Sequence, residues 1–218
     1  MKKGGTQKLI DSLVAKAQPV ADRSSMVKPL FAWIAIIVGL VVVSFAAAEL
    51  LMPEKEWDFY LWNPALLFAL LPAIPAGIWV IALSLPGRRT KPYQIATILF
   101  FTLWGGYLLF DLIQTDTIVD AVMATQKNRC IFDILLIGAL PLLFLLIIVR
   151  TRFVLNRETS MIAIFLSSSL AAAACTGILC KDHSSLHVFQ EHYLPVTVLL
   201  MILILVRRHI PSAKEASP

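Results

Sequence analysis

Charged residues are scarce in this chain. Asp, Glu, Lys and Arg make up 15% of its 218 residues, against about a quarter in a typical soluble domain. Apolar residues make up 58% of the chain. So few charges do not cover the surface of a water-soluble globule of this size. The composition therefore argues against soluble enzymes, nucleic-acid-binding domains and disordered proteins, and it indicates a polytopic membrane protein.

Two further features are missing. The first 29 residues have neither the apolar core nor the small-residue cleavage site of a secretory signal, so we expect this segment to remain in the mature protein. The middle of every long apolar stretch contains no ionisable residue and no His. Ionisable groups at that depth are typical of proton and ion pathways, and paired histidines hold haem in the bilayer. Their absence argues against a proton-coupled carrier and against a haem protein.

Six apolar stretches are each close to the roughly 20 residues that a helix needs to cross a bilayer. They cover about Leu30–Met52, Leu61–Leu85, Tyr93–Ile113, Ile131–Val149, Ser160–Leu179 and Leu186–Val206. We therefore predict an all-α fold of six transmembrane helices over residues 30–206. Residues 1–29 form an N-terminal segment, and residues 207–218 form a tail.

The charges predict the orientation. Fifteen of the 19 Lys and Arg residues lie in the N-terminal segment, in the loops after the second and fourth spans, and in the tail. Ten of the 14 acidic residues lie on the other side. The positive-inside rule then predicts cytoplasmic termini. The net charge of +5 thus reports orientation rather than binding to nucleic acid.

Small residues gather in the second and third spans. We expect them to allow close packing of helices rather than to line a pore. They are Ala73, Ala76, Gly77, Gly105 and Gly106.

The three cysteines include no CxxC pair. A membrane enzyme that passes electrons from thiols to quinone would be expected to have one. Cys130 begins the fourth span and Cys180 ends the fifth, so both are predicted at the outer boundary, where an oxidising periplasm allows disulfides to persist. Cys175 lies inside the fifth span, and we expect it to be a small buried core residue.

Histidines follow Cys180. His183, His187 and Glu191 are spaced at i, i+4 and i+8, so in a helix they share a face. Thiolate and imidazole together suit Cu, Zn or Cd, although the spacing matches no standard zinc motif. Two interpretations remain open at this point: a redox or metal site, or ordinary loop residues beside packed thiols.

The N-terminal segment is predicted to contain a short amphipathic helix. Leu9, Ile10, Leu13 and Val14 fall on one face, and Pro19 ends the helix soon afterwards. A helix of about three turns is marginal alone and needs a surface that buries its apolar face. That surface is either membrane lipid, which attracts the lysines, or a groove on a soluble partner protein.

The arrangement resembles the NrsF-type anti-sigma factors, six-span proteins of the bacterial inner membrane. The likeness is carried by the N-terminal segment, the Leu83–Gly87 step and Cys130. It is carried further by the run Cys180-x-Asp182-x-x-x-x-His187, which is followed by His192 and Pro195.

The resemblance implies a regulator rather than an enzyme. Leu9, Ile10, Leu13 and Val14 would hold an extracytoplasmic-function sigma factor, with no direct contact to nucleic acid. Oxidative or metal stress would release the sigma factor through a sensor at the outer face. That sensor would comprise Cys130, Cys180, Asp182, His187 and His192, and any metal would be bound by the two Cys and two His residues. The alternative function is that of a quinone-linked thiol oxidoreductase or a metal transporter.

Overall fold

A computed structural model describes six segments of the chain. They are residues 26–51, 64–85, 87–114, 130–150, 157–180 and 184–207. The predicted N-terminal helix with Leu9, Ile10, Leu13 and Val14 lies outside these residues, as do Asp182 and His183.

The described residues are almost entirely helical, which confirms the all-α prediction. The elements are α2 (Val27–Leu51), α4 (Pro64–Leu83), α5 (Lys91–Gln114), α7 (Cys130–Arg150), α8 (Arg157–Leu179), α9 (Ser185–Val188), η1 (Phe189–Tyr193) and α10 (Leu194–Arg207). The last three form one continuous helix. Helices suit an apolar environment because each backbone N–H and C=O is satisfied inside its own segment.

Among the described residues, five helices are long and apolar enough to cross a membrane, and α9, η1 and α10 together count as one of them. The apolar part of α4 is shorter, Phe68–Leu83. All helix ends lie within three residues of the predicted spans. The cytoplasmic position of the termini stays a prediction.

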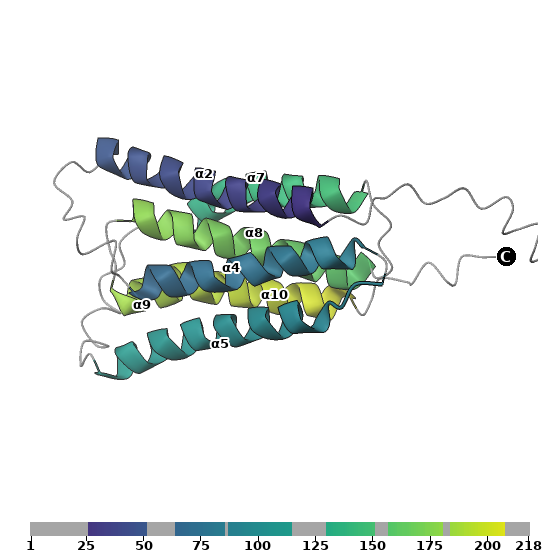
Figure 1. Ribbon diagram of the computed structural model, residues 1–218. Coiled ribbons are helices and arrows are strands. Elements are labelled where there is room, and N and C mark those ends of the chain that lie inside the picture. Colours follow the sequence, from purple (N-terminus) through teal and green to yellow (C-terminus); the bar gives the residue numbers. More distant parts are fainter. Residues whose placement is uncertain are drawn as a thin grey trace, which may run out of the picture.

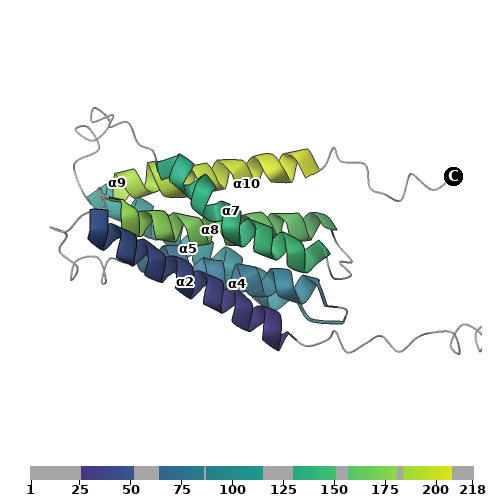
Figure 2. The ribbon, with the colours of Figure 1, turned by 90° about the horizontal axis from the view of Figure 1, so that it is seen from above.

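Successive helices run in opposite directions along the bundle (Figure 1). The beginning of α2 and the end of α10 therefore lie at one end. The beginnings of α7 and α9 and the end of α8 lie at the other end (Figure 2). We call it the cluster end, because a group of Cys and His residues described below lies there.

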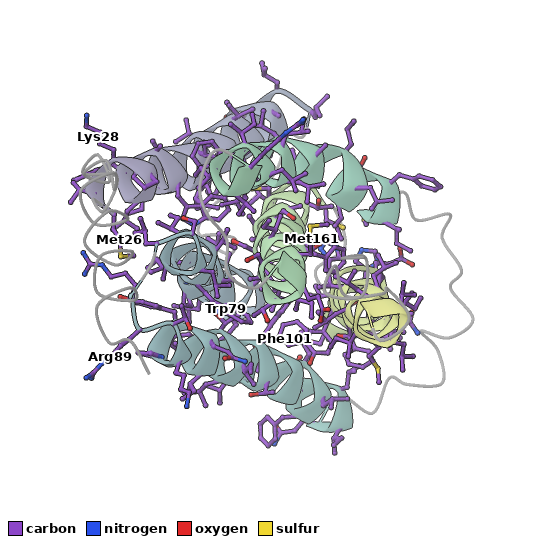
Figure 3. The ribbon with its side chains drawn as sticks, turned by 90° about the vertical axis from the view of Figure 1, so that its right-hand side faces the viewer. Met26, Lys28, Trp79, Arg89, Phe101 and Met161 are labelled. Carbon is purple, nitrogen blue, oxygen red and sulfur yellow. The ribbon has the colours of Figure 1, made fainter. Side chains whose placement is uncertain are left out.

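Helix α8 lies in the middle of the bundle. Seen end-on, it is surrounded by other helices, and it packs against α2, α4, α7 and α10 (Figure 3). In its most apolar window 78% of residues are buried, against 17–28% in the other four candidate spans. Small side chains such as Ala163 and Ala172 let its neighbours approach, and Ser167 Oγ donates a hydrogen bond of 3.2 Å to the Ala73 carbonyl of α4. The outer helices instead expose large apolar side chains such as Phe31 and Phe132, as expected of a surface in contact with lipid.

Glycines of α4 and α5 allow two close contacts. Gly77 lies against the indole of Trp33 in α2, and Gly105 lies against the ring of Tyr193 in η1. Ala73 and Ala76 are fully buried. These four positions confirm the packing prediction. Gly106 contradicts it, because that residue is exposed and a Cβ there would meet open space.

Candidate functional site

Four side chains from three segments meet at the cluster end. Cys130 is the first residue of α7, Cys180 follows α8 directly, His187 lies in α9 and His192 lies in η1. One ligand atom from each lies within 4.8 Å of the others. We call these four residues the Cys/His cluster. The fold thus brings together four of the five residues predicted for the sensor.

The two sulfur atoms are close but not bonded to each other. Cys130 Sγ lies 3.6 Å from Cys180 Sγ, and no disulfide joins them. His187 Nε2 lies 3.1 Å from Cys180 Sγ and 3.5 Å from Cys130 Sγ. Both cysteines are half-buried, and both histidines are buried. The cluster is therefore partly shielded from solvent but reached by it on the cysteine side.

The local sequence explains why His187 lies beside the two cysteines. Ser184 is the N-cap of α9, and its Oγ accepts a hydrogen bond from the His187 backbone N–H at 3.4 Å. The helix therefore starts only five residues after Cys180. Ser185 Oγ donates a hydrogen bond to the Asp111 carboxylate, which joins the start of α9 to the end of α5.

A π-turn places His192 beside His187. The two histidines are five residues apart, and at 100° per residue in an α-helix they would point about 140° away from each other. In η1 the backbone hydrogen bonds span five residues, so the two rings share a face, with centroids 5.6 Å apart. Such turns are rare and often occur at functional sites. The i, i+4 spacing pointed to Glu191 as the partner of His187, whereas His192 supplies the fourth atom of the cluster.

Helix α8 orients the His192 ring. A carbonyl oxygen accepts hydrogen bonds only, so His192 Nδ1 donates to the Ala173 carbonyl at 3.1 Å. In the neutral ring Nε2 then carries the lone pair. His192 is only 1% exposed, and its Nε2 has no hydrogen-bond partner of standard geometry. Glu191 Oε2 is also buried without a partner in the same turn.

The surroundings favour a thiolate at Cys180. Its pKa is held far below the usual value of a thiol, chiefly by the hydrogen bond from Cys130. Burial acts in the opposite direction, and the His187 and His192 rings lower the pKa further. The thiolate is the form of cysteine that binds metals and attacks oxidants.

A comparison with protein families matches residues 13–210 to NrsF, described as a negative regulator of sigma F. The chain belongs to the NrsF family. No curated protein and no solved structure matches it.

The match to NrsF confirms the resemblance that the sequence suggested. As a member of this family the chain is a regulator by its family description, rather than an enzyme. Cys175 is buried in α8 at 1% exposure and does not belong to the Cys/His cluster, as expected. Neither the role of the Ala173 carbonyl nor the Ser185–Asp111 contact was predictable from the residue pattern. Ser184 and Ser185 lie just before the next predicted helix. Because serine is a preferred N-cap, this position was the one sequence signal for the start of α9.

Proposed function

We propose that this NrsF-family protein is a membrane anti-sigma factor with a sensor at the cluster end. Its N-terminal segment binds an extracytoplasmic-function sigma factor, and the Cys/His cluster controls that binding. The observation that carries the proposal is the family match together with the meeting of Cys130, Cys180, His187 and His192.

The proposal also assigns an orientation. The distribution of Lys and Arg supports a cytoplasmic N-terminal segment and C-terminal tail in the inner membrane. Because the cluster end is opposite to the beginning of α2, the cluster then faces the periplasm. The sensor and the partner-binding segment lie on opposite sides of the membrane, so the helices must carry the signal.

The packing suggests which helices carry it. Cys180 directly follows α8, and α8 packs against α2, the helix that follows the N-terminal segment. Helix α2 also contacts α4 and α7, which both pack against α8, because the buried Trp33 lies against Gly77 of α4 and stacks on Phe144 of α7 with ring centroids 6.4 Å apart. A shift of α8 is therefore transmitted to α2 by packed side chains rather than through lipid.

The sensor must supply enough free energy to release the sigma factor. Moving the sigma factor from 99% bound to 99% free requires a differential affinity of about 5.5 kcal/mol. A disulfide typically contributes about 2–4 kcal/mol, and a structural zinc site about 10–16 kcal/mol. A metal bond at the cluster meets this demand more easily than a disulfide alone.

Capture of the sigma factor tests the proposal. The tagged full-length protein is expressed with extracytoplasmic-function sigma factors of the same organism, solubilised in detergent and recovered by its tag. We expect one sigma factor to be retained and to be released when hydrogen peroxide or a thiol-binding metal is added. Failure to retain any of them would overturn the anti-sigma function.

A further inference from the structure

We propose that the Cys/His cluster holds one zinc ion in the resting protein, and that oxidation of its two cysteines by a peroxide releases the ion. The regulatory part of this inference rests on the proposed anti-sigma function, whereas the zinc site itself does not.

The spacing of the ligand atoms fits a metal better than a disulfide. With Zn–S bonds of about 2.3 Å, two thiolates on a tetrahedral ion lie about 3.8 Å apart, and a thiolate and an imidazole about 3.6 Å apart. The observed distances are 3.6 Å between the sulfurs, and 3.5 Å and 3.1 Å from Cys130 and Cys180 to His187 Nε2. A disulfide requires about 2.05 Å between the sulfurs. The thiols are thus spaced as two ligands of one ion.

The orphaned atoms at the cluster are the independent observation. Buried polar groups almost always have a hydrogen-bond partner, yet His192 Nε2 has none of standard geometry. Its Nδ1 donates to the Ala173 carbonyl, which is how the second nitrogen of a metal-bound histidine is usually held. The Nε2 lone pair lies within 4.8 Å of the other three ligand atoms. A cation at the cluster supplies the missing partner.

The donor set selects the ion. Four protein ligands, two thiolates and two imidazoles, are typical of closed tetrahedral zinc sites. A fully occupied set leaves no open position for substrate, so the ion has a structural rather than a catalytic role. It would join the start of α7, the end of α8 and the α9–η1 turn, three segments that no disulfide among the described residues connects.

Oxidation removes two of the four ligands in two balanced steps. The Cys180 thiolate attacks a peroxide oxygen; an S–O bond forms, the O–O bond breaks, and hydroxide leaves. The Cys130 thiolate then attacks the resulting sulfenic sulfur; the S–S bond forms, the S–O bond breaks, and a second hydroxide leaves. For hydrogen peroxide, two protons from solvent convert both hydroxides to water. Two electrons pass from the sulfurs to the peroxide. Disulfide formation removes both anionic ligands from the zinc ion. The ion is left with two imidazoles and dissociates.

Metal content of the full-length protein tests the site. The protein is purified in detergent without added metal or chelator, and its metals are measured by mass spectrometry. We expect about one zinc per chain. His192→Gln and Cys130→Ser should lose most of it, whereas Cys175→Ser, which changes a buried thiol outside the cluster, should keep it. Wild-type protein without stoichiometric zinc, or with stoichiometric copper or iron, would overturn the assignment.

A titration with Co²⁺ distinguishes a variant that has lost a metal ligand from one that no longer folds. Wild-type protein is stripped with a chelator and titrated with Co²⁺, whose visible absorption reports tetrahedral coordination and bonds to thiolate. We expect both signals in the wild type and in Cys175→Ser. We expect His192→Gln to keep the wild-type circular dichroism while it binds Co²⁺ at least tenfold more weakly, as loss of a ligand implies. Unchanged affinity in His192→Gln would remove His192 from the site.

A peroxide titration tests the release. With a chromogenic zinc chelator present, hydrogen peroxide should release one zinc for every two thiols lost, and a reductant should restore both. Zinc that stays bound after both thiols are oxidised would overturn the release step. All these measurements use the protein without its partner. A protein that holds zinc but captures no sigma factor would therefore refute the proposed function and leave the site standing, and the reverse result would refute only the site.

Discussion

Tyr193 of η1 lies against Gly105 of α5 so closely that its ring fills the space that a Cβ on Gly105 would take. The ring also stacks on Phe101 at 4.9 Å and meets Trp104 edge-on at 5.2 Å. Because Tyr193 directly follows His192, this contact sets the distance between α5 and the turn that carries the fourth residue of the Cys/His cluster. Helix α5 thus positions the site without supplying a ligand.

The first prediction concerns this contact. Gly105→Ala should displace Tyr193 and destabilise the protein by about 1–3 kcal/mol, the usual cost of overpacking. It should also weaken Co²⁺ binding, since His192 moves with Tyr193. Gly106→Ala is the matched control, because a Cβ there meets open space on an exposed face. Thermal unfolding in detergent measures the stability, and equal melting temperatures for the two variants would contradict the prediction.

The second prediction concerns the π-turn. Removal of Gln190, an exposed residue of η1, should convert the turn to an ordinary α-helix in which the two histidines are four residues apart. At that spacing they still share a face, so metal binding should persist. Insertion of one alanine after Gln190 should instead turn His192 by about 100° and abolish binding. A cobalt titration of both variants measures this, and binding by the insertion variant would rule out the role of the turn.

The third prediction concerns the sensor. The double variant Cys130→Ser, Cys180→Ser should be made at normal levels but should no longer respond to peroxide, because serine forms neither a disulfide nor a stable zinc bond. A reporter under the control of the sigma factor should lose its induction, whereas Cys175→Ser should retain it. Unchanged induction in the double variant would exclude these cysteines as the sensor.

The fourth prediction concerns the partner. Leu13→Asp places a charge on the apolar face of the predicted N-terminal helix and should weaken sigma-factor binding by about 2 kcal/mol or more, roughly thirtyfold. Ala15→Asp adds the same charge to the opposite face and should have little effect. Capture by the tagged membrane protein measures both. If Leu13→Asp still captures the sigma factor while retaining its membrane insertion, the helix lies on lipid instead.

Hydropathy predicted the helices because crossing a bilayer demands long uncharged segments, and the bounds of α5 and α7 agree with the expected spans within two residues. It also placed Cys130 and Cys180 at the same boundary, because both are at span ends on one side, and the structure shows that their sulfurs lie 3.6 Å apart. The family resemblance implied that His187 and His192 act together, but their spacing did not, since it is the π-turn that brings residues five apart onto one face. Gly105 and Gly106 show the same limit: their sequence contexts are alike, and only the rotation of α5 decides which one faces Tyr193.

The enclosure of α8 has a further consequence. Most of its surface touches protein rather than lipid, so changes in bilayer thickness or tension act first on the outer helices. Helix α8, which ends directly before Cys180, is affected by such changes only through its neighbours. For the proposed sensor, this geometry would separate chemical stimuli at the cluster from mechanical disturbance of the membrane, so that an oxidant would be sensed without a response to each change in lipid composition.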